Sequence, residues 1–181
     1  DLADALVRTR RRIEAAAGAA GRNSDELTLV VVTKFFPAAD VRLLAELGVR
    51  DVGENRHQEA ADKAPQCADL DLTWHFIGGL QSNKAAAVAA YADVVESVDR
   101  AKLLTGLSKG AVQRGRELDC LVQVSLAVGE LLGERERVPG LDQHVKPPAL
   151  YSRSFWLVGF EDLGHLAHAR LLRPLVDDPS A

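Results

Sequence analysis

The amino-acid sequence predicts an α/β protein with a parallel sheet built from repeated βα units. Strand starts recur about every 20–27 residues, with helical segments between them, a rhythm typical of right-handed crossovers. The first strand is a continuous apolar, β-branched run, as in parallel strands that are buried on both faces. Ligands of such sheets bind at the carboxyl ends of the strands, so we look for chemistry there.

Five strands are expected, over residues 28–33, 49–52, 73–77, 93–98 and 120–126. A helix is expected over 2–20, with Leu6 and Ala17 near one face and Gly21 as its C-cap. The next helix lies between the first two strands, with Pro37 near its start and Gly48 at its end. Two further helices are expected over 83–92 and 100–115.

Both an open doubly wound sheet and a (β/α) barrel begin in this way. The leading helix and the lack of a Gly-x-Gly-x-x-Gly turn after the first strand favour the barrel. A full barrel typically needs ~250 residues, and the smallest ~200. With 181 residues, the chain predicts a (β/α)8 TIM-barrel-like fold that is incomplete, with about five recognisable βα units.

The βα rhythm stops near residue 129. Five of the seven prolines lie beyond this point, although 154–160 has the composition of a strand and 161–172 that of a helix. We therefore expect two regions, a barrel portion over 1–126 and an atypical tail over 127–181. Such a change of composition is what a frameshift, a misjoined gene model or a deletion would produce.

Composition limits the classes of partner. The net charge of −4 argues against nucleic acid and anionic membrane, because both call for a basic surface. No long uncharged apolar stretch and no signal peptide are visible, and no paired metal-ligand spacing occurs, so neither a membrane span nor a metal site is expected. Cys67 and Cys120 are expected to be free thiols in a reducing cytoplasm. The chain starts at Asp1 without any methionine, so a start has been removed or this is a fragment.

Lys34 is the first candidate for chemistry. The run LTLVVVTKFFP (27–37) puts this lysine where the first strand meets its loop. A lysine there is either a solvated strand end or an amine that reacts with a carbonyl. Phe35 and Phe36 follow it, and apolar surroundings disfavour the ammonium form and favour the free amine that Schiff-base chemistry requires.

The loop after the second strand provides Asn55. In VGENRHQEA (52–60), Gly53 permits a tight turn, and Glu54 and Asn55 are expected at the mouth of the sheet. Asn55 is expected as the N-cap of the next helix, as a hydrogen-bond partner for a ring hydroxyl or oxyanion near Lys34, or as both through different atoms.

The third strand provides His75, in WHFIGGLQSNK (74–84). If Trp74 and Phe76 pack outward on helices, His75 points into the barrel, as a satisfied core group or as a ligand. Ser82 or Asn83 is expected to cap the next helix, whose exposed amides also suit an anion.

These segments resemble one known family in order and spacing. VVTKFFP, GVRDVGENRHQEA, WHFIGGLQSNK and VESVD, followed by a helix and LVQVSL, are similar to the pyridoxal-phosphate homeostasis proteins. These are one-domain relatives of the alanine racemase amino-terminal barrel, and the resemblance runs from about residue 2 to residue 126. The joint occurrence of the lysine, the GEN segment and the histidine segment makes it specific.

The resemblance implies a (β/α)8 barrel that carries pyridoxal 5′-phosphate as a Schiff base on Lys34. It implies that Asn55 lies beside the cofactor ring and His75 within the barrel mouth. A cytoplasmic carrier that supplies cofactor to pyridoxal-phosphate-dependent apoenzymes is implied, rather than an enzyme with established turnover, and a monomer or loose dimer. A racemase needs a second acid/base, which its relatives take from a further domain, and this chain has only Tyr91 and Tyr151.

The tail departs from the family. There, later loops cup the phosphate through a GMS-D-like turn and an R-G-T-like turn, and neither follows residue 126 here. Losing a few charge-assisted hydrogen bonds of ~1.5–3 kcal/mol each lowers affinity by several orders of magnitude. Two other hypotheses therefore stay open: a racemase or Schiff-base lyase that uses Lys34 directly, and a non-functional or partner-binding remnant in which 154–160 covers an open sheet edge.

Overall fold

The computed structural model describes residues 1–123 and 154–159, and these contain one curved sheet of six parallel strands. The strands are β1 (Leu27–Val32), β2 (Asp51–Glu54), β3 (Thr73–Phe76), β4 (Val94–Val98), β5 (Asp119–Val122) and β6 (Ser154–Gly159). Their order is β5-β4-β3-β2-β1-β6, and all neighbours are parallel. Because β1 to β5 are neighbours in chain order, this part of the sheet has no strand-order reversal of the kind found in doubly wound folds.

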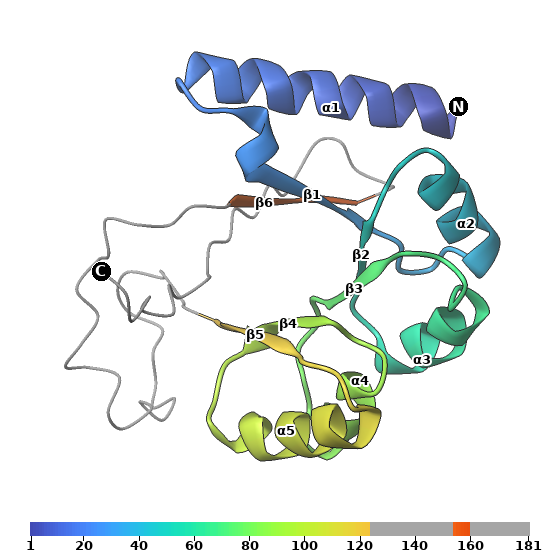
Figure 1. The fold of residues 1–181 in the computed structure, drawn as a ribbon, viewed down its shortest axis with the longest axis vertical. Helices are drawn as coiled ribbons and strands as arrows, with labels where there is room; N and C mark the ends of the chain where they lie inside the picture. The colour runs from blue at the N-terminus through green and yellow to red at the C-terminus, as the bar shows by residue number, and fades with distance from the viewer. Residues whose placement is uncertain (124–153, 160–181) are drawn as a thin grey trace, which may run out of the picture.

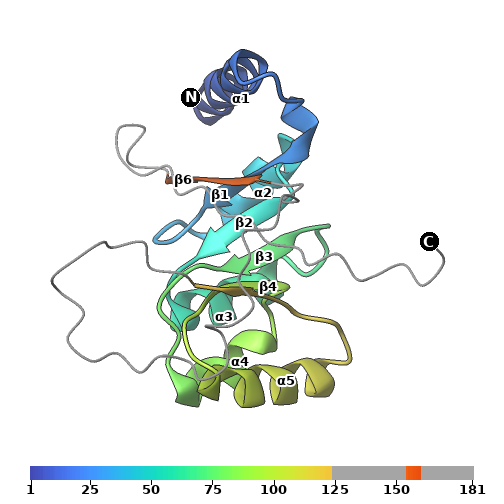
Figure 2. The ribbon, with the colours of Figure 1, turned by 90° about the vertical axis from the view of Figure 1, so that its left-hand side faces the viewer.

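The helices lie on the outside of this arc. They are α1 (Leu2–Ala19), α2 (Ala38–Glu46), α3 (His57–Gln66), α4 (Ala85–Ala89) and α5 (Lys102–Arg114), with short 3-10 turns η1 (Ser24–Glu26) and η2 (Ser82–Lys84). Figure 1 shows α2 to α5 along the convex side of the sheet. Figure 2 shows the strands stacked from β6 and β1 to β4, with α1 at one end and α5 at the other. One-sided helices on a curved parallel sheet form a half-barrel, which confirms the incomplete barrel expected from the sequence.

The apolar core lies between the sheet and these helices. One cluster joins Trp74 to Val52 of β2 and to Leu44 of α2, and a second joins Phe76 to Leu103 and Leu107 of α5. Trp74 and Phe76 therefore pack outward, which is the condition under which His75 is expected to point into the barrel. The residues that alternate with these outward-packing residues along each strand have their side chains on the other, concave face of the sheet.

Gly53 of β2 lies on the concave face of the sheet. A Cβ atom built on this glycine lies 3.3 Å from a methyl group of Val30 and 3.5 Å from side-chain atoms of Val32 and Ile77. These side chains therefore share the inner face of the arc. His75 has the same parity on β3 as Ile77, so it belongs to this face too.

Most element boundaries differ from the prediction by one or two residues, and two of the differences have a clear structural reason. β2 begins at Asp51 rather than at residue 49, because Val49 belongs to the end of α2: its amide donates to Leu44 O at 3.0 Å, and Gly48 has φ +80°. The helix expected over 83–92 is shorter, since residues 82–84 form η2 and α4 covers Ala85–Ala89. Gly21 has φ +66° after α1, as expected of a C-terminal glycine.

The strand expected over 154–160 is confirmed as β6. It pairs in parallel with β1 along its length, from Leu27 opposite Ser154 to Val32 opposite Gly159. The helix expected over 161–172 and the last residues of the fifth strand, 124–126, lie outside the described residues. The division at residue 126 stays a prediction.

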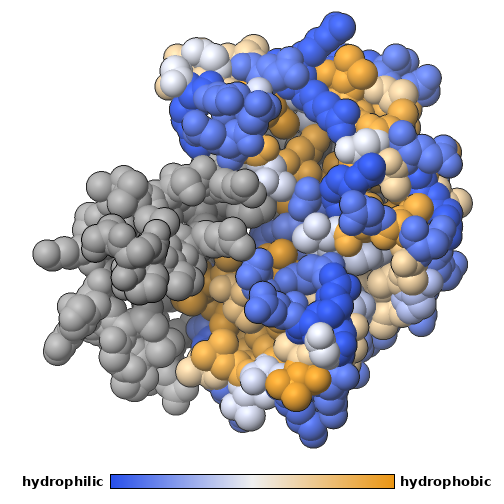
Figure 3. Space-filling view, in the orientation of Figure 1, coloured by the Kyte–Doolittle hydropathy of each residue, from blue (hydrophilic) through white to orange (hydrophobic). Residues whose placement is uncertain are grey.

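The surface seen in Figure 3 is mostly hydrophilic, with smaller apolar areas between the polar ones. Exposed large apolar side chains are spread over several elements: Val7, Phe35, Leu43, Leu104, Val112 and Val122. Among the helices of the described residues, none is long and apolar enough to cross a membrane.

Candidate functional site at the carboxyl edge of the sheet

Lys34 lies in a tight turn directly after β1. The turn covers residues 33–36, and the amide of Phe36 donates to Thr33 O at 3.1 Å. Phe35, the third residue of the turn, has φ +68°, which is the geometry of a type II turn. Lys34 itself is half-buried, and its Nζ lies 5.6 Å from the centroid of the exposed Phe35 ring. The amine therefore sits at the carboxyl edge, as the sequence predicts, but the ring beside it is exposed.

A buried ion pair lies beneath this turn, on the helix side of the sheet. Lys63 Nζ of α3 donates to Glu54 Oε1 at 2.5 Å and to Thr33 O at 2.8 Å. Thr33 Oγ1 donates to the same Glu54 oxygen at 2.7 Å, and both Thr33 and Glu54 are fully buried. We call these three residues the Glu54/Lys63 cluster. It ties the end of β1, the end of β2 and α3 together.

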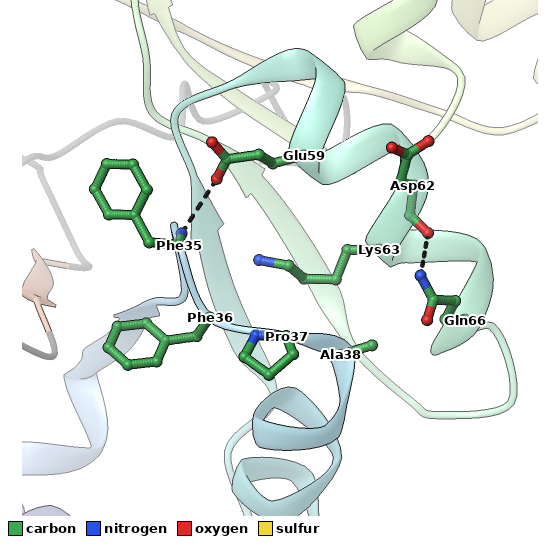
Figure 4. A pocket seen from close by; sticks show the side chains of 8 residues that line it. All are labelled: Phe35, Phe36, Pro37, Ala38, Glu59, Asp62, Lys63 and Gln66. Atoms are coloured by element: carbon green, nitrogen blue, oxygen red, sulfur yellow. Dashed lines mark hydrogen bonds between the residues drawn. The ribbon is translucent and has the colours of Figure 1, made fainter.

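A groove of about 520 Å³ opens beside the cluster (Figure 4). It is lined by Phe35, Phe36, Pro37, Ala38, Glu59, Asp62, Lys63 and Gln66. At its rim, Glu59 Oε2 accepts a hydrogen bond from the amide of Phe35 at 3.1 Å. Glu59 Oε1 accepts from Arg56 at 3.2 Å, and the Arg56 guanidinium lies 4.9 Å from the Phe35 ring centroid. Lys34 and Arg56 thus place two cations beside one aromatic ring.

Asn55 follows β2 at the same edge, but it is not the N-cap of α3. The helix begins at His57, and its N-cap is Arg56, without a side-chain hydrogen bond. The N-cap interpretation of Asn55 was therefore wrong. Its Oδ1 atom is buried and has no hydrogen-bond partner among the described residues. The backbone of Asn55 also packs tightly, since a Cβ atom on Gly78 would lie 2.1 Å from Asn55 O.

His75 lies deeper on the concave face. In the strand register it is level with Gly53 and Val32, whereas Lys34 and Asn55 are two residues beyond that row. Its Nδ1 lies 2.8 Å from Glu96 Oε1 and its Nε2 lies 3.1 Å from Asp51 Oδ1. We call these residues, Asp51, His75 and Glu96, the His75 cluster.

The two carboxylates beside His75 raise its pKa, so the ring is charged at neutral pH. Burial alone would lower the pKa of His75, but the hydrogen bonds and charges of Asp51 and Glu96 outweigh it and raise this pKa to about 9. Both ring nitrogens are occupied by carboxylates, which is the arrangement of a satisfied core histidine. The structure does not bring His75 to the level of Lys34.

Two further rings are stacked between α3 and α4. His57 and Tyr91 lie with centroids 5.9 Å apart and an interplanar angle of 14°. Burial and the nearby Glu54 carboxylate raise the pKa of Tyr91, and burial and Lys84 lower the pKa of His57. The Tyr91 hydroxyl is buried without a hydrogen-bond partner among the described residues. Ser82 and Asn83 do not cap α4, because its N-cap is Lys84 and Ser82–Lys84 forms η2.

Sequence reasoning missed Lys63. Its spacing of four residues from Glu59 looks like an ordinary ion pair on a helix surface. Lys63 is nevertheless on the buried stripe that also contains Ala60, Ala64 and Cys67. That stripe, at spacings of three and four residues, is the signal that would have found it.

Fold and site together define a (β/α)-barrel type of protein with a lysine in the turn after its first strand. No family model matches the chain. Over 176 residues it is 39% identical to the pyridoxal phosphate homeostasis protein of Mycobacterium tuberculosis, covering 88% of this chain and 68% of the relative. The protein of the same name from Pseudomonas aeruginosa is 38% identical over 184 residues, covering 97% and 80%. The chain belongs to the pyridoxal phosphate homeostasis protein family.

Solved structures agree with this assignment. PipY of Synechococcus elongatus, solved with PLP bound, is 38% identical with a TM-score of 0.54, over 64% of this chain and 55% of that one. The same protein solved without PLP gives 39% identity and the same TM-score. The chain therefore spans about half the length of these solved relatives.

Proposed function

We propose that the chain binds pyridoxal phosphate reversibly through Lys34 and takes part in the homeostasis of this cofactor. The observation that carries the proposal is the half-buried Lys34 amine in the turn after β1, in a chain of this family. The PLP-bound relative of 38% identity supports it.

The residues at the edge fit such a ligand. A bound pyridoxal phosphate supplies an aldehyde, whose carbon forms a C=N bond to a lysine nitrogen while its oxygen leaves as water. Lys34 provides a primary amine on a half-buried side chain. Asn55 provides a buried Oδ1 acceptor without a partner among the described residues, which suits the hydroxyl of a ligand ring. His75 lies two residues deeper along the strands than Lys34. We propose that its contacts with Asp51 and Glu96 stabilise the inner face beneath the site, and that it does not contact the ligand.

Lys34 is a better candidate than the buried lysine beside it. Lys63 is almost fully buried, and its ammonium is held by Glu54 and by the carbonyl of Thr33. Forming a covalent bond there would break a buried ion pair, whereas the contact that the described residues give the Lys34 amine is with an exposed ring. We therefore expect modification to be selective for Lys34.

A carrier role is proposed in preference to catalytic turnover. The relatives are named for homeostasis. A racemase needs a second acid/base, and Tyr91, the one tyrosine within the described residues, is stacked on His57 on the helix side with its hydroxyl buried. We further propose that the acceptors of the cofactor are pyridoxal-phosphate-dependent apoenzymes, and that the chain acts as a monomer in the cytoplasm. The free thiols Cys67 and Cys120 support a reducing compartment.

Borohydride trapping tests this proposal. The purified chain is incubated with pyridoxal phosphate, its visible absorbance is recorded, and the sample is reduced and mapped by mass spectrometry. We expect an absorbance band and a label confined to Lys34, both lost in Lys34→Ala and both retained in Lys109→Ala, which changes an exposed lysine of α5. A label spread over surface lysines, or one that survives Lys34→Ala, would show that Lys34 does not carry the function.

A further inference from the structure

The residue before Lys34 is fixed from three directions. The amide of Thr33 donates to Gly53 O at 2.9 Å, which extends the pairing of β1 with β2. Its carbonyl accepts from the amide of Phe36 and from Lys63 Nζ, and its hydroxyl donates to Glu54. Since Thr33 is fully buried, the start of the turn has little freedom.

The residue after Lys34 is held in an unfavourable backbone conformation. Within the described residues, Phe35 is the one non-glycine residue with positive φ. The third position of a type II turn favours glycine or asparagine, because a Cβ atom crowds the left-handed region. Such conformations persist where surrounding contacts enforce them, and they cluster at functional sites.

The contact that enforces this conformation comes from α3. Glu59 Oε2 accepts the hydrogen bond of the Phe35 amide. Figure 4 shows the Glu59 carboxylate reaching the 33–36 turn from α3, and Lys63, four residues further along the helix, extending toward the same loop. The carboxylate is itself oriented by Arg56. Helix α3 therefore touches the turn on both sides of Lys34, through Lys63 to Thr33 and through Glu59 to Phe35.

We propose that Glu59 and Lys63 are positioning residues that lock the turn at residues 33–36 and fix the direction in which the Lys34 amine is presented to an aldehyde. This rests on the proposed function of Lys34. Glu59 acts through the backbone of Phe35 and Lys63 through the backbone of Thr33. Neither residue forms a bond to the ligand.

The test uses Glu59, because the loss of Lys63 would destabilise the fold. Glu59→Leu removes the acceptor of the Phe35 amide at similar size, and Glu59→Gln keeps an oxygen acceptor there. Gln58→Leu is the matched control, since Gln58 is an exposed neighbour on the same helix. Two readouts are taken from the full chain: hydrogen exchange of the Phe35 amide without cofactor, and the initial rate of borohydride-trapped label at Lys34 with pyridoxal phosphate.

In Glu59→Leu we expect faster exchange of the Phe35 amide and slower trapping at Lys34, each by roughly tenfold, the size expected for one lost hydrogen bond to a charged group. Glu59→Gln and Gln58→Leu should remain close to the wild type. Trapping that is unchanged in Glu59→Leu, with or without a change in exchange, would overturn the positioning role.

A second pair of variants separates turn geometry from the aromatic ring. Phe35→Asn and Phe35→Ala both remove the ring, but asparagine tolerates positive φ and alanine does not. Combined with Glu59→Leu, Phe35→Asn should restore most of the trapping rate, and Phe35→Ala should not. Equal rates in the two double variants would contradict the proposal.

The two hypotheses fail in different ways. If the wild-type chain is not labelled at Lys34, the proposed function fails, and the presentation of the amine to an aldehyde fails with it. The exchange of the Phe35 amide then still shows whether Glu59 holds the turn. If the wild type is labelled and Glu59→Leu is labelled at the same rate, only the positioning role fails.

Discussion

The Glu54/Lys63 cluster and the His75 cluster bury a cation on opposite faces of the sheet, and each uses a carboxylate of β2. In the first, on the helix side, Lys63 meets a single carboxylate and a backbone carbonyl. In the second, on the concave face, His75 lies between two carboxylates, Asp51 and Glu96. The first lies directly under the turn that presents Lys34, and in the second His75 lies two residues deeper along the strands than Lys34.

The His75 cluster also has a histidine whose pKa is shifted by the two carboxylates beside it. His75 loses its charge as pH approaches its raised pKa of about 9. The inner face of the half-barrel is therefore held by a contact that weakens as the pH rises toward about 9. Three changes test this comparison, beginning with the largest effect.

Removing the Lys63 ammonium should have the largest effect. Lys63→Met keeps the length of the side chain but leaves the fully buried Glu54 carboxylate without its cation. Breaking a buried pair in this way costs about 3–5 kcal/mol of the free energy of unfolding. Urea denaturation of the full chain measures it, with Lys102→Met, an exposed lysine at the start of α5, as control. A loss as small as that of the control would mean that the pair is not buried in solution.

Raising the pH should weaken the His75 cluster by a somewhat smaller amount. The pKa of His75 rises from 6.5 to about 9 on folding, so its stabilisation is fully present below pH 6.5 and is lost between pH 6.5 and pH 9. A rise of that size corresponds to about 3 kcal/mol of the free energy of unfolding.

Denaturation midpoints at pH 6 and pH 9.5 measure this effect. His75→Gln, which removes the titrating group, should be less stable than the wild type at pH 6 and should show a smaller change with pH. Because the Cys67 and Cys120 thiols also ionise at alkaline pH, the difference between the two proteins is the quantity to compare. Parallel pH curves would show that His75 does not carry the dependence.

The sequence predicted the features that depend on local pattern. The apolar run of β1, the shared face of Trp74 and Phe76, and Lys34 at the carboxyl edge all follow from periodicity and from the rule that parallel strands end at one edge. Even β6, which is far from β1 in sequence, was recognisable as a strand.

The features that were missed depend on tertiary contacts. Val49 has the composition of a strand residue, yet its amide closes the end of α2, so β2 starts later than predicted. Lys63 has the spacing of a surface residue, yet it turns inward to meet Glu54, whose burial only the packing of α3 on the sheet determines. Sequence pattern predicts which residues are apolar, but it does not predict which polar residues are buried with a partner.

The smallest effect is expected at Thr33, and it tests whether the Glu54/Lys63 cluster acts as a unit. Thr33→Val removes the hydroxyl that donates to Glu54 at nearly constant volume, while Lys63 still pairs with the carboxylate. The loss should be about 1 kcal/mol of the free energy of unfolding. In the Lys63→Met background the same change should cost more, because the hydroxyl is then the remaining donor that this structure gives to Glu54 Oε1. Equal costs in the two backgrounds would mean that Thr33 and Lys63 contact Glu54 independently, and that the turn is held by separate contacts rather than by one network.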